Sequence, residues 1–171
     1  MTSANEGGAL TQVRFWRSYE AAINAVAVVL FAAMVVVTAA GVFFRYVLNA
    51  ALPWAEEADR YLLIWLSFVG AAITMRHQAH IAVDILVRSF SAAARDWAAL
   101  LTYGCILVFV GTVFWASERV IDVTSTTRTT ATDIPMSWVY LAVPVGCTLI
   151  AIEVLRLAAR TVRRMMRSAT P

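Results

Sequence analysis

Two histidines and two cysteines are the side chains of this sequence best suited to ligate a metal or a haem. A zinc site needs three or four converging nitrogen, sulfur or oxygen ligands, and His77 and His80 have only Asp84 near them in the sequence. A haem held by two histidines would need them on facing helices, and the chain has no third histidine. Cys105 and Cys147 fall within apolar segments, where packed thiols are the usual case. We therefore predict no catalytic residue, no cofactor and no metal site.

The two histidines belong instead to a polar stripe. At about 100° per residue on a helix, His77 and His80 would share one face with Asp84, Arg88 and Arg95. Apolar residues flank that stripe on both sides, as in a helix that lies in the membrane interface. We predict a short amphipathic interfacial helix over residues 78–95. A metal or haem role and a hydrogen-bonding role between subunits are the alternatives.

Carboxylates in the middle of an apolar segment would indicate a proton or ion path through a membrane. Here Glu20 and Glu153 lie only at the ends of apolar runs, and the residues inside the runs are apolar or weakly polar. A channel or coupled carrier that worked alone would need polar groups at that depth. The sequence therefore indicates that a partner protein holds any transport path.

The composition predicts that a membrane domain positions these residues. Hydrophobic residues make up 61% of the 171 residues and charged residues only 15%, against about 25% charged residues in soluble chains. All 14 basic residues are arginines that flank apolar segments and form no separate basic surface. We therefore expect a lipid bilayer and no nucleic acid as a partner. No linker or repeat divides the chain, so we expect a single membrane domain over residues 1–171.

Charged residues divide the chain into four apolar runs. Three of them, with 24, 21 and 19 uncharged residues, can each span a hydrocarbon core of about 30 Å. The other run, Tyr61–Met75, has 15 residues. It becomes long enough if its helix begins near Pro53, where Glu56 could pair with Arg60 one turn later. We predict an all-α integral membrane protein with four transmembrane helices, at residues 20–44, 54–75, 97–117 and 134–155.

The distribution of arginine predicts the orientation. Ten arginines lie in the N-terminal segment, the segment between spans two and three, and the C-terminal tail, whereas four lie in the other two connections. Positively charged residues accumulate in cytoplasmic loops. We therefore expect both termini in the cytoplasm.

Two prolines near the last span have different structural consequences. Pro135 stands where a helix begins, so its missing N–H costs no hydrogen bond. Pro144 lies inside the span and removes the hydrogen bond to the carbonyl of Tyr140, so we expect a kink there. Gly146 would let another backbone approach closely.

Three segments carry a wider pattern. The first is Phe44-Arg45-Tyr46, followed by Pro53-Trp54-Ala55-Glu56-Glu57 and an aromatic second span with Trp65 and Gly70. The second is Arg76-x-x-x-His80-Ile-x-Val-Asp84. The third is Asp133-Ile-Pro135-x-x-Trp138-x-Tyr140-x-x-x-Pro144-Val-Gly146. In their order and placement relative to the four spans, over residues 15–160, they resemble the small membrane subunit of the tripartite ATP-independent periplasmic (TRAP) transporters.

This resemblance implies an accessory transporter subunit in the bacterial inner membrane and not an enzyme. In that family a large membrane subunit holds the sodium and substrate sites, and a periplasmic substrate-binding protein delivers an organic acid. The small subunit braces the large one. For nine residues we expect contact with the partner, with lipid anchoring or local salt bridges as the alternative: Arg45, Trp54, Glu56, Glu57, Trp65, His80, Asp84, Pro135 and Pro144.

Two other functional classes are alternatives. One is a haem- or quinone-linked membrane anchor of a respiratory enzyme, which would show a haem absorbance band. The other is a small transporter that works alone, which would show uptake without partners. Neither accounts for the segment Pro53–Glu57. The pattern does not specify which organic acid is transported.

Overall fold

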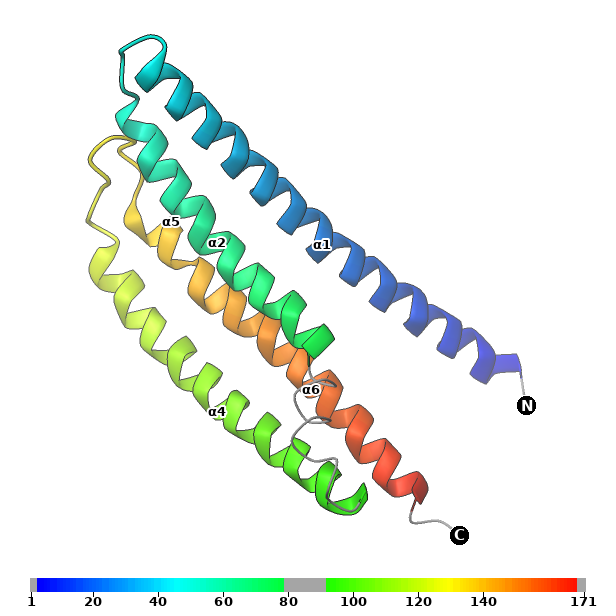
Figure 1. The fold of residues 1–171 in the computed structure, drawn as a ribbon. Coiled ribbons are helices and arrows are strands. Elements are labelled where there is room, and N and C mark those ends of the chain that lie inside the picture. Colours follow the sequence, from blue (N-terminus) through cyan, green and yellow to red (C-terminus); the bar gives the residue numbers. More distant parts are fainter. Residues whose placement is uncertain (1–2, 79–91, 169–171) are drawn as a thin grey trace.

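The fold is an all-helical bundle whose long helices run side by side. The computed structural model describes residues 3–78 and 92–168. Its helices are α1 (Ser3–Tyr46), α2 (Pro53–Gln78), α4 (Ala92–Thr124), α5 (Met136–Tyr140) and α6 (Ala142–Ser168). Helix α6 packs against both α2 and α4, and α1 packs against α2 on the outside of the bundle (Figure 1).

Four segments of the described chain are long and apolar enough to cross a membrane. They are Trp16–Tyr46, Pro53–Arg76, Ala94–Thr124 and Met136–Met166. The prediction of an all-α membrane protein with four transmembrane helices is therefore confirmed. The interfacial helix predicted over residues 78–95 lies mostly outside the described residues, which resume at Ala92 with the start of α4.

The helices extend beyond the apolar runs that they contain. Helix α1 has 44 residues, and at 1.5 Å per residue it is roughly 66 Å long, about twice the thickness of a hydrocarbon core. Its N-terminal part carries polar residues such as Glu6 and Gln12 and continues as helix, although Gly7 and Gly8 disfavour helix. The charged residues therefore mark the membrane boundary without ending the helix.

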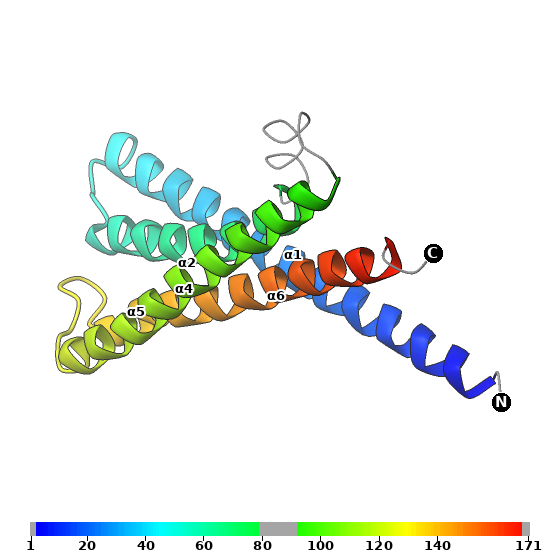
Figure 2. The same cartoon turned by 90° about the horizontal axis from the view of Figure 1, so that it is seen from below.

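The two ends of the bundle carry different parts of the chain. The α1–α2 and α4–α5 connections lie at one end, the loop end, and both termini lie at the other, the terminal end (Figure 1). Toward the terminal end, α1 diverges from α6 (Figure 2). Helix α1 therefore makes its close helix packing with α2.

The last span is interrupted where the sequence predicts a kink. Leu141 forms a turn between α5 and α6. The N–H groups of Leu141 and Val145 still donate to the carbonyls of Ser137 and Leu141, at 2.9 and 3.2 Å. Pro144 has no N–H with which to reach the carbonyl of Tyr140. The helix therefore breaks beside the carbonyl that loses its donor.

Outward-facing side chains of the spans are largely apolar. Val29 and Val36 on α1, and Leu101 and Phe109 on α4, are each about two-thirds exposed, at 66%, 67%, 71% and 67%. Exposing this much apolar surface to water is unfavourable, whereas its contact with lipid or with a second membrane subunit is favourable. The exterior is therefore suited to a bilayer and to contact with another membrane protein.

A glycine allows α2 and α6 to approach closely. A Cβ atom built on Gly146 of α6 would lie 2.5 Å from the Cβ of Phe68 on α2 and 2.6 Å from its Cδ1. These distances are far shorter than van der Waals contact. The close approach predicted at Gly146 is therefore made by Phe68 of the same chain.

We expect Gly146→Ala to lower the free energy of unfolding by about 1–3 kcal/mol, the usual cost of overpacking. The Cβ of Phe68 is bonded directly to its backbone, so the added methyl group must push α2 away from α6. Unfolding in detergent, followed by circular dichroism, measures the effect.

The matched control is Gly111→Ala on α4, because no atom lies within 4 Å of the added Cβ there. Alanine favours helix over glycine, so this variant should gain about 0.5–1 kcal/mol. Equal stability of the two variants would contradict the packing of Gly146 on Phe68.

Candidate functional site

Polar contacts between helices gather at the two ends of the bundle. At the loop end they join α1, α2 and the α4–α5 connection. At the terminal end they join α1, α2, α4 and α6. These two layers contain the groups through which the protein could bind another molecule.

An ion pair at the loop end joins the first two helices. The guanidinium of Arg45, in the last turn of α1, bonds to the carboxylate of Glu56, in the first turn of α2. Both side chains are largely exposed, at 49% and 66%. The sequence suggested Arg60 as the partner of Glu56, whereas the structure pairs Glu56 with Arg45. The pair closes the short α1–α2 connection.

Glu57 holds the α4–α5 connection against α2. Its Oε1 accepts a hydrogen bond from the backbone N–H of Ala131 at 3.1 Å. Its Oε2 accepts one from the N–H of Thr132 at 3.2 Å and one from the Thr132 hydroxyl at 3.0 Å. The connection also turns sharply at Asp133, which has a φ of 53°. Glu57 therefore has three donors within its own chain.

Asp59 is a partly buried carboxylate of α2 that faces α1. Its Oδ2 accepts a hydrogen bond from the hydroxyl of Thr38 on α1 at 3.0 Å. Its Oδ1 is buried and has no hydrogen-bond partner among the described residues. Both residues line a small cavity of about 220 Å³ between α1 and α2, together with Arg45 and Glu56. No local sequence pattern pairs Thr38 with Asp59, because their contact depends on how α1 and α2 are rotated.

The predicted aromatic residues differ in exposure. Trp54, in the first turn of α2, is 42% exposed, whereas Trp65 is half-buried. Trp138, on α5 at the same end, is 63% exposed. Tryptophans at the end of a span are placed to anchor in the membrane interface. Trp54 is therefore available to lipid or to a partner.

The predicted prolines lie at the beginnings of helices. Pro135 directly precedes α5 and forms an isolated bridge with Arg128 across the α4–α5 connection. Pro144 lies in the first turn of α6. His80 and Asp84, predicted to contact a partner at the opposite membrane face, lie outside the described residues. Among the described members of the predicted set, the structure joins Arg45 and Glu56 by an ion pair.

At the terminal end, Arg156 is the centre of a buried polar cluster. Its Nη1 lies 2.6 Å from the Oε1 of Glu20 on α1 and 3.7 Å from the Oε2 of Glu153 on α6. Its guanidinium also lies over the ring of Trp16, 4.3 Å from the centroid. The side chains of Arg156 and Glu153 are only 15% and 3% exposed. This cluster ties α1 to α6 where the two helices diverge.

Two further contacts join helices at the terminal end. Arg164 of α6 bonds to Asp96 of α4. Arg76 of α2 donates to the side-chain oxygen of Asn24 on α1 at 2.9 Å. In the sequence, Glu20 marks the end of a span. Its pairing with Arg156 could not be predicted, because the two residues are 136 positions apart. Only the spacing of Glu153 and Arg156, one turn apart on α6, was visible in the sequence.

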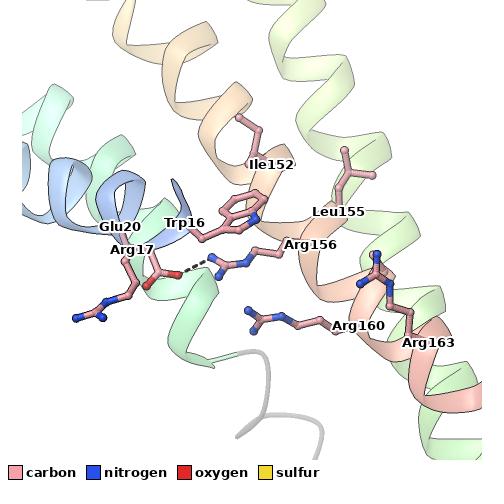
Figure 3. Close-up of a pocket in the computed structure, with 9 residues that line it drawn as sticks. Trp16, Arg17, Glu20, Ile152, Leu155, Arg156, Arg160 and Arg163 are labelled. Atoms are coloured by element: carbon pink, nitrogen blue, oxygen red, sulfur yellow. Dashed lines mark hydrogen bonds and ion pairs between the residues drawn. The ribbon is translucent and has the colours of Figure 1, made fainter. Parts of the chain in front are cut away.

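A groove lies between α1 and α6 beside this cluster. Its volume is about 670 Å³. Figure 3 shows Arg156 and Arg160 extending from α6 on the side of α1, with the ring of Trp16 above Arg156. We call it the α1–α6 groove, and its lining residues are Trp16, Arg17, Glu20, Ile152, Leu155, Arg156, Ala159, Arg160 and Arg163.

Metal-ligating side chains are scattered in the described part of the chain. No group of three or more histidine, cysteine, aspartate or glutamate residues converges within residues 3–78 and 92–168. Cys147 is buried and Cys105 is exposed, and both are free thiols. The polar side chains at the two ends of the bundle can fasten helices to one another, and the arginines among them can bind anions.

A sequence model of one protein family matches residues 34–164, from the last third of α1 into α6. That family is described as "Tripartite ATP-independent periplasmic transporters, DctQ component". The match therefore extends over more than half of the chain and reaches all four spans.

Curated relatives carry related names. The C4-dicarboxylate TRAP transporter small permease protein DctQ of Vibrio cholerae is 35% identical over 77 residues, which are 45% of this chain and 33% of the relative. Its namesake from Rhodobacter capsulatus is 30% identical over 109 residues, 63% of this chain and 48% of the relative. The isethionate TRAP transporter permease protein DctMQ of Oleidesulfovibrio alaskensis is 29% identical over 116 residues, 67% of this chain and 18% of the relative. The chain spans less than half the length of these relatives.

Proposed function

This chain belongs to the family of DctQ components of TRAP transporters, and we propose that it braces the large membrane subunit of a sodium-coupled importer of organic acids. Members of the family are small permease subunits of transporters and not enzymes. The observation that carries the proposal is the family match over residues 34–164, which reaches all four spans. The proposal has four parts: the bracing role, the substrate class, the partner proteins and the orientation in the membrane.

The contacts of the helices support the role of a brace. Ion pairs and hydrogen bonds fasten α1 to α2 at the loop end and α1 to α6 at the terminal end. Glu57 holds the α4–α5 connection to α2 as well. A bundle fastened at both ends resists the relative motion of its helices. Such rigidity suits a static scaffold against which a moving transport domain can work.

The names of the relatives support an organic acid as the substrate. Two of them are named for C4-dicarboxylates and one for isethionate. Each of these compounds is a small organic anion. We propose the same class for the transporter to which this chain contributes, with the sodium gradient as the driving force.

A fused relative supports partnership with a large membrane subunit. The DctMQ permease protein matches this chain over only 18% of its own length. The rest of that protein has room for a larger permease part. For this chain, we propose that the larger part is a separate subunit. A periplasmic substrate-binding protein is the second proposed partner, in keeping with the family description.

Orientation in the bacterial inner membrane is proposed from the arginines. The terminal end carries both termini and most of the arginine (Figure 1), which favours the cytoplasm. Single cysteines at Ala4 and Thr170, in a background without Cys105 and Cys147, should resist an impermeant thiol reagent in intact cells.

Single cysteines at Asn49 or Thr127, in the connections at the loop end, should react in the same experiment. If both termini react from outside and the loop-end positions do not, the orientation is the reverse of the one proposed.

Co-purification tests the proposed partnership. A tagged form of this chain should retain the large subunit in mild detergent. Glu56→Gln/Glu57→Gln should reduce that retention several-fold, because both carboxylates order the loop end that we propose as part of the interface. Glu118→Gln, an exposed carboxylate of α4 near the same end, is the matched control.

A second measurement separates loop order from partner binding. In the isolated chain, Glu57→Gln should raise the rate at which a cysteine at Thr130 is labelled, because glutamine cannot replace both acceptor oxygens. If the loop loosens and the large subunit is still retained, the loop end is not the interface. If the parent chain itself retains no large subunit, the brace is rejected.

A further inference from the structure

The α1–α6 groove combines two kinds of surface. Toward the middle of the membrane its wall is apolar, with Ile152 and Leu155 on α6. Leu155 is 55% exposed. Toward the end of the bundle its wall is cationic. Arg160 extends from α6 on the side of α1 (Figure 3), and Arg17 on α1 is also among the lining residues. A molecule that fits both surfaces has an anionic group and an apolar chain.

The groove carries an excess of positive charge. Four arginines and one glutamate line it, and the glutamate, Glu20, is already bonded to Arg156. Arg17, Arg160 and Arg163 are exposed and have no hydrogen bond or salt bridge to the residues that the structure describes. Three guanidinium groups are therefore left to bind an anion from outside the chain.

Guanidinium groups are suited to phosphate, because their planar set of N–H donors matches its oxygens. Basic pockets between transmembrane helices at a membrane surface bind anionic lipid headgroups. Here the arginines lie where the spans reach the membrane boundary, and the apolar wall continues into the hydrocarbon core. An anionic phospholipid satisfies both surfaces of the groove at once.

We propose that the α1–α6 groove binds an anionic phospholipid, with its phosphate at Arg17 and Arg160 and an acyl chain along Ile152 and Leu155. The lipid fills the space left by the divergence of α1 from α6, where α1 makes its close helix packing with α2 instead (Figure 2). It thereby supports the Glu20–Arg156 connection from the membrane side.

Native mass spectrometry of the full chain, released from detergent after incubation with phosphatidylglycerol or phosphatidylcholine, tests the proposal. The parent should prefer phosphatidylglycerol, and R17Q/R160Q should weaken its binding by about 25-fold, since each arginine near a membrane surface contributes on the order of fivefold. R60Q/R119Q, which removes two exposed arginines elsewhere, should keep the parental preference. Millimolar inorganic phosphate should not displace the lipid.

Several outcomes would overturn the proposal. They are equal binding of the two lipids by the parent, an equal loss in R60Q/R119Q, and displacement by inorganic phosphate. Retained lipid preference in R17Q/R160Q, together with loss of the large subunit, would make the groove a protein interface instead. Circular dichroism verifies the fold, and R160Q/R163Q measures the same charge if the first variant does not fold.

Discussion

Replacing Arg156 with methionine should destabilise the protein by about 3–5 kcal/mol, the usual cost of removing one partner of a buried ion pair. The change leaves the carboxylate of Glu153, whose side chain is 3% exposed, without its cation. It also breaks the 2.6 Å contact with Glu20 and the stacking on Trp16. Equilibrium unfolding of the purified chain in mixed micelles, followed by circular dichroism, measures the loss.

A second variant separates the buried charge from the packing. Arg156→Met/Glu153→Leu removes both charges of the pair within α6, and similar exchanges for apolar residues are often neutral or stabilising. Much of the lost stability should therefore return. Arg60→Met, at an exposed arginine of α2, is the control and should change stability by less than about 0.5 kcal/mol. If Arg156→Met is as stable as Arg60→Met, the cluster does not hold α1 to α6.

Reconstituted alone in proteoliposomes with a sodium gradient, the chain should import no organic acid. A coupled carrier needs ionisable or polar groups along a path through the membrane. In the described helices the ionisable groups gather toward the two ends, and several of them pair with one another. We therefore expect the path to lie in the large subunit, with uptake restored when that subunit and the periplasmic binding protein are added.

The controls for uptake are the complete assembly without a sodium gradient and vesicles without protein. A chain that fails through misfolding is identified by its circular dichroism spectrum and by loss of co-purification with the large subunit. Sodium-dependent uptake by the folded chain alone would end the proposal of an accessory subunit, although the family assignment would remain.

Several features of this protein could be predicted from local sequence. Charged residues bracket the apolar runs, and in a bilayer only helices satisfy the backbone of such runs, so the four spans follow directly. Pro144 lacks one N–H, which places the break at Leu141. The spaced motifs led to the family through their order and their placement relative to the spans. Each of these features depends on backbone hydrogen bonding or on residues close in the chain.

Side-chain partners required the tertiary structure. Glu56 could have paired with Arg60 on its own helix, yet it pairs with Arg45 on the preceding one. Glu57 was considered for a contact with another subunit, and it accepts hydrogen bonds from Ala131 and Thr132 of its own chain. The sequence gives no distance between such residues until the rotation and the depth of each helix are known.

Rotation and depth are decided by how the helices pack. At Gly146 the absence of a side chain admits Phe68, and this contact sets how α2 lies on α6. Where α1 diverges from α6, Glu20 still reaches Arg156, and the groove lies beside this pair. The sequence of this protein by itself determined which segments cross the membrane, because the choice of segments depends on the free energy of each segment in lipid. Only the tertiary structure decided which charges meet, because that depends on the shapes of surfaces far apart in the chain.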